Sequence, residues 1–336
     1  MGSVKRFDNL DFLKCICAFL IVCIHGYFPG EIGIFIKAFS RFAVPVFFMI
    51  TGFFYTDTKK NNKQKKQIIK IAKLTIISNI AFFIFYSLFN LLKGDLSDYI
   101  QKSFTIKNFI KLIVINESPF GYHLWYLGAI LYVLIIAYLL DKIKLEKIMY
   151  LVVPLLLICN FVFGAYSNFF FHKDFDYLLV RNFIFIGLPH FYIGMYIRKI
   201  YDSKKLIFVR RNLLVTMSII FSASIIAELL FLKSLNGTMV KSHYISTTCL
   251  AVVIFILAIT DRQYNGSIYN HIVSIGRNYS TLIYIIHPIW IVILNYIIAK
   301  IGMYKIYYSV RPFAVFIMTL LSIWIYNKII KFKSVR

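Results

Sequence analysis

The sequence contains few charged residues, and acidic residues are the scarcest of them. Only 14 of its 336 residues are Asp or Glu, against 38 Lys and Arg, and charged residues make up 15% of the chain. About a quarter of the residues in a water-soluble domain are charged. The low charge, a hydrophobic share of 60% and a mean hydropathy of +0.74 exclude a soluble globule and indicate a polytopic membrane protein.

Cysteine is also scarce, and its placement excludes two classes of site. The five cysteines all fall in apolar segments without a CxxC pair: Cys15, Cys17, Cys23, Cys159 and Cys249. This pattern gives neither a disulfide framework nor a cysteine-based metal site. We therefore expect small core residues, with no bound metal.

The sequence has no internal repeat and no low-complexity segment, and the polar run from Thr58 to Gln67 indicates a solvated inner loop. Its net charge of +24 comes from short basic clusters between apolar runs, which argues against a nucleic-acid partner. The first apolar run begins near Leu10, carries Asp11 and Lys14, and lacks a small-residue cleavage site. We expect one transmembrane domain over residues 1–336, with no appended soluble domain and with membrane lipids as its surroundings.

Windows of about twenty apolar residues predict an all-α bundle of about ten transmembrane helices. The predicted ranges are 9–28, 39–56, 71–92, 123–140, 147–164, 181–198, 212–232, 246–260, 279–299 and 311–330. If the N-terminus is cytoplasmic, 24 of the 38 basic residues fall on the inner side. The positive-inside rule then predicts that both termini are cytoplasmic. We expect a multi-pass protein of the plasma membrane.

The first predicted helix carries two ionisable side chains, Lys14 and His25, eleven residues apart. Eleven residues are almost three helical turns, so the two side chains share a face about 16 Å apart along the axis. Ionisable groups in a membrane segment are costly and usually functional. His25 could act as a general base toward a hydroxyl.

The second predicted helix begins with Arg41 and contains Pro45 and the pair Thr51–Gly52. Because the loop after the first helix is short, Arg41 should lie at the depth of His25 and could hold an anionic or polar group. An interfacial His and a snorkelling Arg are the alternative. Pro45 and Gly52 predict a kink, a local break or a close helix approach.

Other polar residues mark both sides of the predicted membrane. Lys70 and Lys73, three apart on the inner side, could bind phosphates, although the positive-inside rule explains them equally well. His123 and Trp125 open the fourth helix in an aromatic belt at the outer surface. His190 and His287 lie mid-span beside prolines, where a histidine often only satisfies a kinked backbone. Glu228 is an intramembrane acid without an evident partner, and residues 106–115 suggest a short interfacial helix.

Several of these segments together resemble one family. The run Leu10-Asp11-Phe-Leu-Lys14 with His25 is similar to the first-helix signature of the acyltransferase 3 family, and Arg41-Phe-Ala-Val-Pro-Val-Phe-Phe-Met-Ile-Thr-Gly resembles its second-helix motif. Three further segments are similar to ones found in many members: His123-Leu-Trp-Tyr-Leu, Gly187-Leu-Pro-His-Phe-Tyr-Ile-Gly194 and Ser280-Thr-Leu-Ile-Tyr-Ile-Ile-His287-Pro.

The resemblance implies an integral membrane O-acyltransferase that takes acetyl or another acyl group from cytoplasmic acyl-CoA. The acceptor is a hydroxyl on an extracytoplasmic glycan, a cell-surface polysaccharide being the first choice; peptidoglycan, lipid-linked and amino-acid-related acceptors are alternatives. His25 and Arg41 take the catalytic positions, and Asp11 belongs to the first signature. Lys14, Lys70 and Lys73 stand where many members have Arg, and the resemblance implies that they bind CoA. Lysine keeps the positive charge of arginine but cannot form two parallel hydrogen bonds to one phosphate, as a guanidinium does. His123, Trp125 and His287 complete the expected site.

Two other functions fit the residues alone. A multi-pass transporter of a small solute or glycan precursor could use the intramembrane His and Lys as its polar pathway, but transporters often show inverted repeats. A sensing or accessory domain could keep the fold without activity. Intact His25 and Arg41 favour the enzyme.

Overall fold

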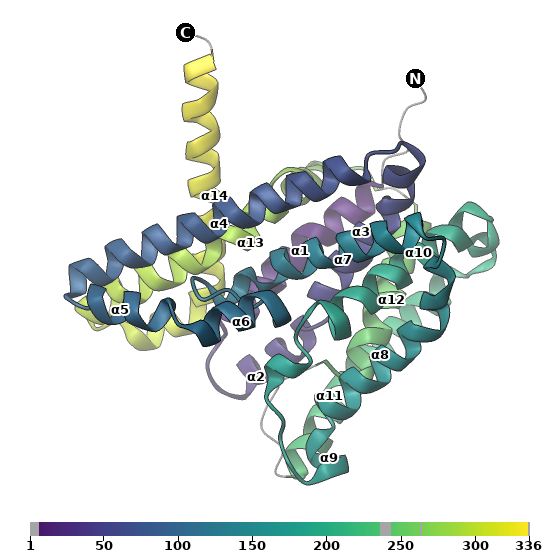
Figure 1. Ribbon diagram of the computed structural model, residues 1–336, viewed down its shortest axis with the longest axis horizontal. Coiled ribbons are helices and arrows are strands. Elements are labelled where there is room, and N and C mark those ends of the chain that lie inside the picture. The colour runs from purple at the N-terminus through teal and green to yellow at the C-terminus, as the bar shows by residue number, and fades with distance from the viewer. Residues whose placement is uncertain (1–6, 236–242, 263, 335–336) are drawn as a thin grey trace. The chain divides into compact units, whose positions relative to one another are not determined.

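The computed structural model describes residues 7–235, 243–262 and 264–334, and Figure 1 shows their arrangement along the chain. Over these residues the protein is helical and contains no strand. The helices are α1 (Asp8–His25), α2 (Gly30–Ser40), α3 (Ala43–Lys60), α4 (Gln64–Lys93), α5 (Leu96–Ser103), α6 (Ile106–Ile115), α7 (Trp125–Lys142), α8 (Met149–Phe163), α9 (Ser167–Phe171), α10 (Leu188–Asp202), α11 (Arg211–Ser234), α12 (Ile245–Thr260), α13 (Ser267–Ile301) and α14 (Tyr304–Ser334).

Seven helical stretches of the described residues are long and apolar enough to cross a membrane. They are Gly30–Lys60, Gln64–Lys93, Tyr122–Lys142, Glu146–Phe163, Arg211–Ser234, Ser267–Ile301 and Tyr304–Ile329. Helices also form over the other predicted ranges, but α1 carries Asp8, Asp11 and Lys14 in its 18 residues, and α10 and α12 have 15 and 16 residues. Ten crossings and cytoplasmic termini stay predictions.

The predicted helix 39–56 was wrong in its start, because the chain turns at Arg41 and Phe42 between α2 and α3. Pro45 is therefore the third residue of α3, where a backbone N–H would have no partner in its own helix. It costs no helical hydrogen bond there and forms no kink. The helix then continues through Thr51 and Gly52 without a break.

The described chain packs as two compact units. The first unit contains α1, α2 and the start of α3 up to Phe47, then residues 206–231 with most of α11, and the chain from Ile245 onward through α12, α13 and α14. The second contains the chain from Phe48 to Lys205, which includes α4 to α10, and the described residues from Leu232, in the last turn of α11, to Tyr244.

In the first unit α1 packs along α13. A Cβ atom added at Gly276 of α13 would lie 1.8 Å from the carbonyl oxygen of Asp11, so the backbones touch at this point. Toward the other end of α1, the ring of His25 contacts the ring of His287. The two helices therefore run parallel. The core between them and α14 consists of Ala18, Val22, Ile283, Val315 and Ile323.

In the second unit glycines bring α3 and α10 together. A Cβ at Gly52 would lie 1.9 Å from the Phe191 carbonyl oxygen, and one at Gly194 would lie 2.1 Å from the Met49 carbonyl oxygen. The close approach predicted at Gly52 is confirmed. No residue larger than glycine fits either position without moving the facing backbone.

The structure also shows the surroundings of Glu228 and of the predicted short interfacial helix. Glu228 of α11 accepts hydrogen bonds from the backbone N–H and hydroxyl of Ser246 on α12, so this intramembrane acid has a partner in the first unit. The predicted short helix is α6, whose first residue follows the N-cap Thr105. Ile106, Ile110 and Ile113 are exposed on it, as an interfacial helix requires.

Candidate functional site

The pair His25 and His287 is the centre of the candidate site in the first unit. The two imidazoles stack with centroids 5.3 Å apart and an interplanar angle of 28°. His25 is the last residue of α1, and the backbone N–H of Gly26 closes the helix on the Val22 carbonyl at 2.7 Å. His25 is half-buried, so its ring can face both the protein and a ligand.

His287 lies in the interior of α13 and has no exposed surface. Its Nδ1 lies 2.9 Å from the Ile283 carbonyl oxygen. Because a carbonyl only accepts, Nδ1 carries the proton in this bond and Nε2 of a neutral ring is then an acceptor. This contact fixes the orientation of the ring that supports His25.

The opposite end of the same helix pair carries a network of charges. Lys14 Nζ lies 2.8 Å from Asp11 Oδ1, and Arg277 of α13 binds Asp11 at 2.8 Å and Asp8 at 2.6 Å. Asp11 is thus shared by two cations. Its side chain is 14% exposed, and a carboxylate so enclosed requires such partners. The sequence interpretation of Lys14 and Asp11 did not include Arg277.

Arg41 follows α2, and its backbone N–H donates to the Ala38 carbonyl at 3.2 Å. Two cations that the sequence interpretation missed lie near Tyr27, two residues beyond His25. The amine of Lys37 is 5.3 Å from the Tyr27 ring centroid, and the guanidinium carbon of Arg311 is 4.6 Å from it. Arg311 also donates to the Tyr27 carbonyl at 2.7 Å. This end of the first unit is therefore electropositive.

His123 and Trp125 belong to the second unit and are both buried. The His123 ring packs on Phe82 with centroids 4.5 Å apart. The Arg181 guanidinium lies 5.6 Å from the Trp125 ring and 5.3 Å from the Tyr177 ring. Arg181 was not singled out from sequence, although it immediately precedes the segment that contains His190.

An asparagine holds this part of the second unit in place. Asn116 donates to the Trp125 carbonyl at 2.8 Å and accepts from the Phe183 backbone N–H at 3.0 Å. Phe183 opens a π-helical turn, Phe183–Gly187, just before α10. The His190 Nδ1 bonds the Ile186 carbonyl at 2.7 Å, so His190 satisfies the irregular backbone, the alternative considered for it from sequence.

Lys70 and Lys73 lie on α4 in the second unit, and both side chains are exposed. Neither forms an ion pair with any residue that the structure describes. Two free lysines one turn apart can bind phosphate oxygens. The five cysteines are free thiols.

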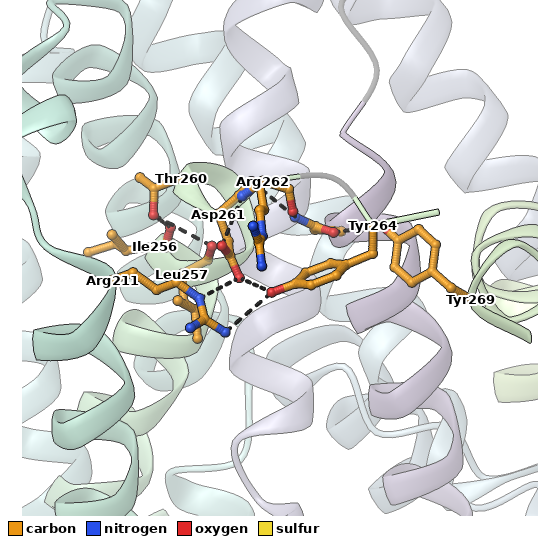
Figure 2. Close-up of polar contacts among 9 residues, drawn as sticks. Arg211, Ile256, Leu257, Thr260, Asp261, Arg262, Tyr264 and Tyr269 are labelled. Atoms are coloured by element: carbon orange, nitrogen blue, oxygen red, sulfur yellow. Dashed lines mark hydrogen bonds and ion pairs between the residues drawn. The ribbon is translucent and has the colours of Figure 1, made fainter. Parts of the chain in front are cut away.

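A polar cluster joins the segment after α12 to the starts of α1 and α11 and to Tyr264, which precedes α13 (Figure 2). The Asp261 carboxylate accepts from Arg211 Nε at 3.2 Å, from the Tyr264 hydroxyl at 2.9 Å and from the Arg262 backbone N–H at 2.9 Å. Asn9 donates to the carbonyl oxygens of Asp261 and Arg262, both at 3.2 Å.

The Asp261 carboxyl is more acidic than usual. Its partial burial favours the neutral form, but the hydrogen bonds from Tyr264, Arg211 and the Arg262 backbone outweigh burial and hold its pKa below the ordinary value. The cluster therefore contains a carboxylate at neutral pH.

These features define a helical membrane protein in which a half-buried histidine at the end of the first helix stacks on a buried one. The family described as "Acyltransferase domain" matches residues 7–327. The chain belongs to this family, the acyltransferase 3 family, as the first-helix and second-helix motifs predict.

The individual proteins that the chain resembles are named for a different activity. The chain is 32% identical over 215 residues to an amino-acid racemase of Enterococcus faecalis, which covers 59% of this chain and 29% of that protein. A second amino-acid racemase of the same organism is 25% identical over 316 residues, covering 86% and 42%. The chain thus spans less than half the length of either curated relative. No solved structure matches it.

Proposed function

We propose that the protein is a plasma-membrane O-acyltransferase that moves an acetyl group from cytoplasmic acetyl-CoA to a hydroxyl of a cell-surface polysaccharide or lipid-linked glycan. Membership of the acyltransferase family supports acyl transfer. The observation that carries the assignment of the base is the stacking of His25 on the fully buried His287 at the end of α1.

In this proposal His25 is the general base. It takes the proton of the acceptor hydroxyl, whose oxygen attacks the acyl carbon of the thioester. The carbon–sulfur bond breaks, the acyl group leaves on the acceptor oxygen as an ester, and the proton passes to the departing CoA thiolate. The electropositive surroundings of Tyr27 favour the negative charge that develops on the acyl oxygen.

His287 is a positioning residue. Its Nδ1 bond to the Ile283 carbonyl fixes the ring, and a fixed ring against one face of His25 reduces the orientations open to the base. Preorganisation of this kind lowers the barrier without direct contact with the reacting atoms.

The family resemblance suggests the remaining roles in this proposal. Lys14 of the first unit, and Lys70 and Lys73 of the second, are each assigned to the phosphates of CoA on the inner side, and Arg41 is assigned to the acyl or acceptor group. His123 and Trp125 are assigned to the acceptor. Asp11 is shared by Lys14 and Arg277.

A second candidate is the transport of a small solute, and the name of the relatives favours an amino acid as that solute. The family membership favours the enzyme over this candidate. The test below separates the two.

The test is acyl transfer in inverted membrane vesicles that contain wild-type protein, His25→Ala or the matched control His271→Ala, an exposed histidine of α13. Radiolabelled acetyl-CoA is supplied, and label in glycan is counted at equal protein levels. We expect loss of label by a factor of about a hundred or more in His25→Ala and none in His271→Ala. Equal label in all three contradicts the role of His25. No label in any, with uptake of radiolabelled amino acids, supports the transporter.

A further inference from the structure

The second unit contains a cavity that none of the candidate site residues lines. Its volume is about 640 Å³, within the range of small-molecule sites. The last turn of α3, the segment that leads into α8, and the last turns of α10 surround it. By the positive-inside prediction these ends face the cytoplasm.

Four lysines and two carboxylates line the cavity. Both carboxylates are already engaged. Glu146 accepts from Lys59 Nζ at 2.7 Å, while Asp202 binds Arg198 Nε at 2.9 Å and lies 3.7 Å from Lys60 Nζ. Lys59 has a second acidic partner in Asp141.

The other two lysines, Lys147 and Lys199, form no ion pair with any residue in the described part of the chain. Lys199 donates to the Tyr150 hydroxyl at 3.2 Å, and its amine lies 5.7 Å from the Tyr150 ring centroid. The cavity wall thus carries four lysines against two carboxylates, and the two carboxylates form their ion pairs with other cations. Positive charge in a cavity wall attracts an anion.

Two tyrosines complete the wall. The rings of Tyr150 and Tyr196 stack with centroids 4.3 Å apart and an angle of 8°. The Tyr196 hydroxyl is buried and has no hydrogen-bond partner among the described residues, so it is a donor in need of an acceptor. Tyr150 is 47% exposed, so the exposed part of its ring, beside the Lys199 amine, can contact a planar ring.

We propose that this cavity binds a phosphate ester, with Lys147 and Lys199 on the phosphate oxygens and the Tyr196 hydroxyl as a further donor. A phosphate offers several acceptor oxygens to donors that arrive from different helices. The phosphate can come from a soluble nucleotide or from the headgroup of an anionic phospholipid. Lys70 and Lys73 do not line this cavity, and phosphate binding here does not require acyl transfer.

The test uses the full-length protein in nanodiscs of phosphatidylcholine. Adenosine 3′,5′-bisphosphate and pyrophosphate are the soluble probes, and nanodiscs with added phosphatidylglycerol supply the lipid probe. Binding is followed by the shift in thermal unfolding and by direct titration. The double variant Lys147→Gln/Lys199→Gln is compared with Lys65→Gln, an exposed lysine of α4 outside the cavity.

We expect the double variant to weaken binding about tenfold or more and Lys65→Gln to leave it unchanged, both variants unfolding at the wild-type temperature without ligand. If Tyr150→Ala weakens the binding of adenosine 3′,5′-bisphosphate more than the binding of pyrophosphate, the ligand is a nucleotide. A response to phosphatidylglycerol alone identifies a lipid headgroup. Equal affinity of wild type and double variant for every probe, or no binding by the wild type, overturns the proposal.

Discussion

At the scale of single residues, the ring of His287 is held in one orientation beside His25. His287 has no exposed surface and donates from Nδ1 to its own helix. A substitution of His287 should therefore affect the reaction more than the binding of either substrate.

We expect His287→Asn, which keeps a donor and removes the stacked ring, to lower kcat about tenfold while the KM for acetyl-CoA stays within twofold. The pH profile of kcat should also change, because the base loses its neighbour. Steady-state kinetics between pH 6 and pH 9 check this. A fall in protein level with unchanged kcat would show a structural role only.

Asp261 gives a pH dependence that follows from its lowered pKa. A carboxyl whose folded-state pKa lies below its unfolded value stabilises the fold above the unfolded pKa of about 3.9, and this stability is lost as pH falls through the folded pKa. Asp261→Asn should lower Tm at pH 7 by roughly 2 °C and by less at pH 3.

Thermal unfolding in detergent at both pH values checks this prediction, with Asp95→Asn as the control. Asp95 is exposed and precedes α5 without a capping hydrogen bond, so its substitution should not change Tm. A Tm difference for Asp261→Asn that is the same at pH 7 and pH 3 would contradict the argument.

Only part of the residue-level site was predictable. The sequence singled out Lys14 and His25 by their place in an apolar helix, and Asp11 by the family resemblance. Their partners Arg277 and His287 lie over 260 residues away in the chain. One signal was present: Arg277 and His287 are ten residues apart, close to the spacing of Lys14 and His25. This equal spacing indicates a contact only once α1 and α13 are known to pack in parallel, which the sequence did not show.

At the scale of helices, the position of α13 against α1 depends on one small residue, Gly276. Gly276 leaves no room between α13 and the Asp11 carbonyl, and this approach sets the register that brings His25 to His287. Register between helices is therefore decided by the point of closest backbone contact.

Gly276→Ala should destabilise the protein by about 2 kcal/mol, because the added methyl group must push the two backbones apart. Gly266→Ala is the matched control, since a Cβ at Gly266 meets nothing within 4 Å. Thermal unfolding of both variants measures the difference. Equal Tm values for the two would show that α1 and α13 are not held by this contact.

At the scale of the whole molecule, the distribution of basic residues predicts the orientation in the membrane. Lys65 lies at the start of α4 among the inner basic residues, and Lys107 lies on α6 in the outer segment; both are exposed. In a variant whose five cysteines are replaced by alanine, Lys107→Cys should react with an impermeant maleimide in intact cells. Lys65→Cys should react only after permeabilisation.

Labelling is read by gel shift, and each variant is compared with the cysteine-free protein. The reverse labelling pattern would mean that the protein has the opposite orientation in the membrane. The proposed phosphate cavity would then lie on the outer side. Labelling of both residues in intact cells would mean that the number of crossings between them is even.

The sequence by itself determined the helical membrane class, the family, and the residues of the first-helix motif, because apolar length, charge scarcity and motif spacing are local properties of a chain. It also determined the extent of α6, where capping and periodicity agree. Tertiary structure alone decided the break at Arg41, the pairing of His25 with His287, the sharing of Asp11 between Lys14 and Arg277, and the cavity beside Tyr150. Each of these depends on which helices touch and in what register, and that is set by packing between segments far apart in sequence.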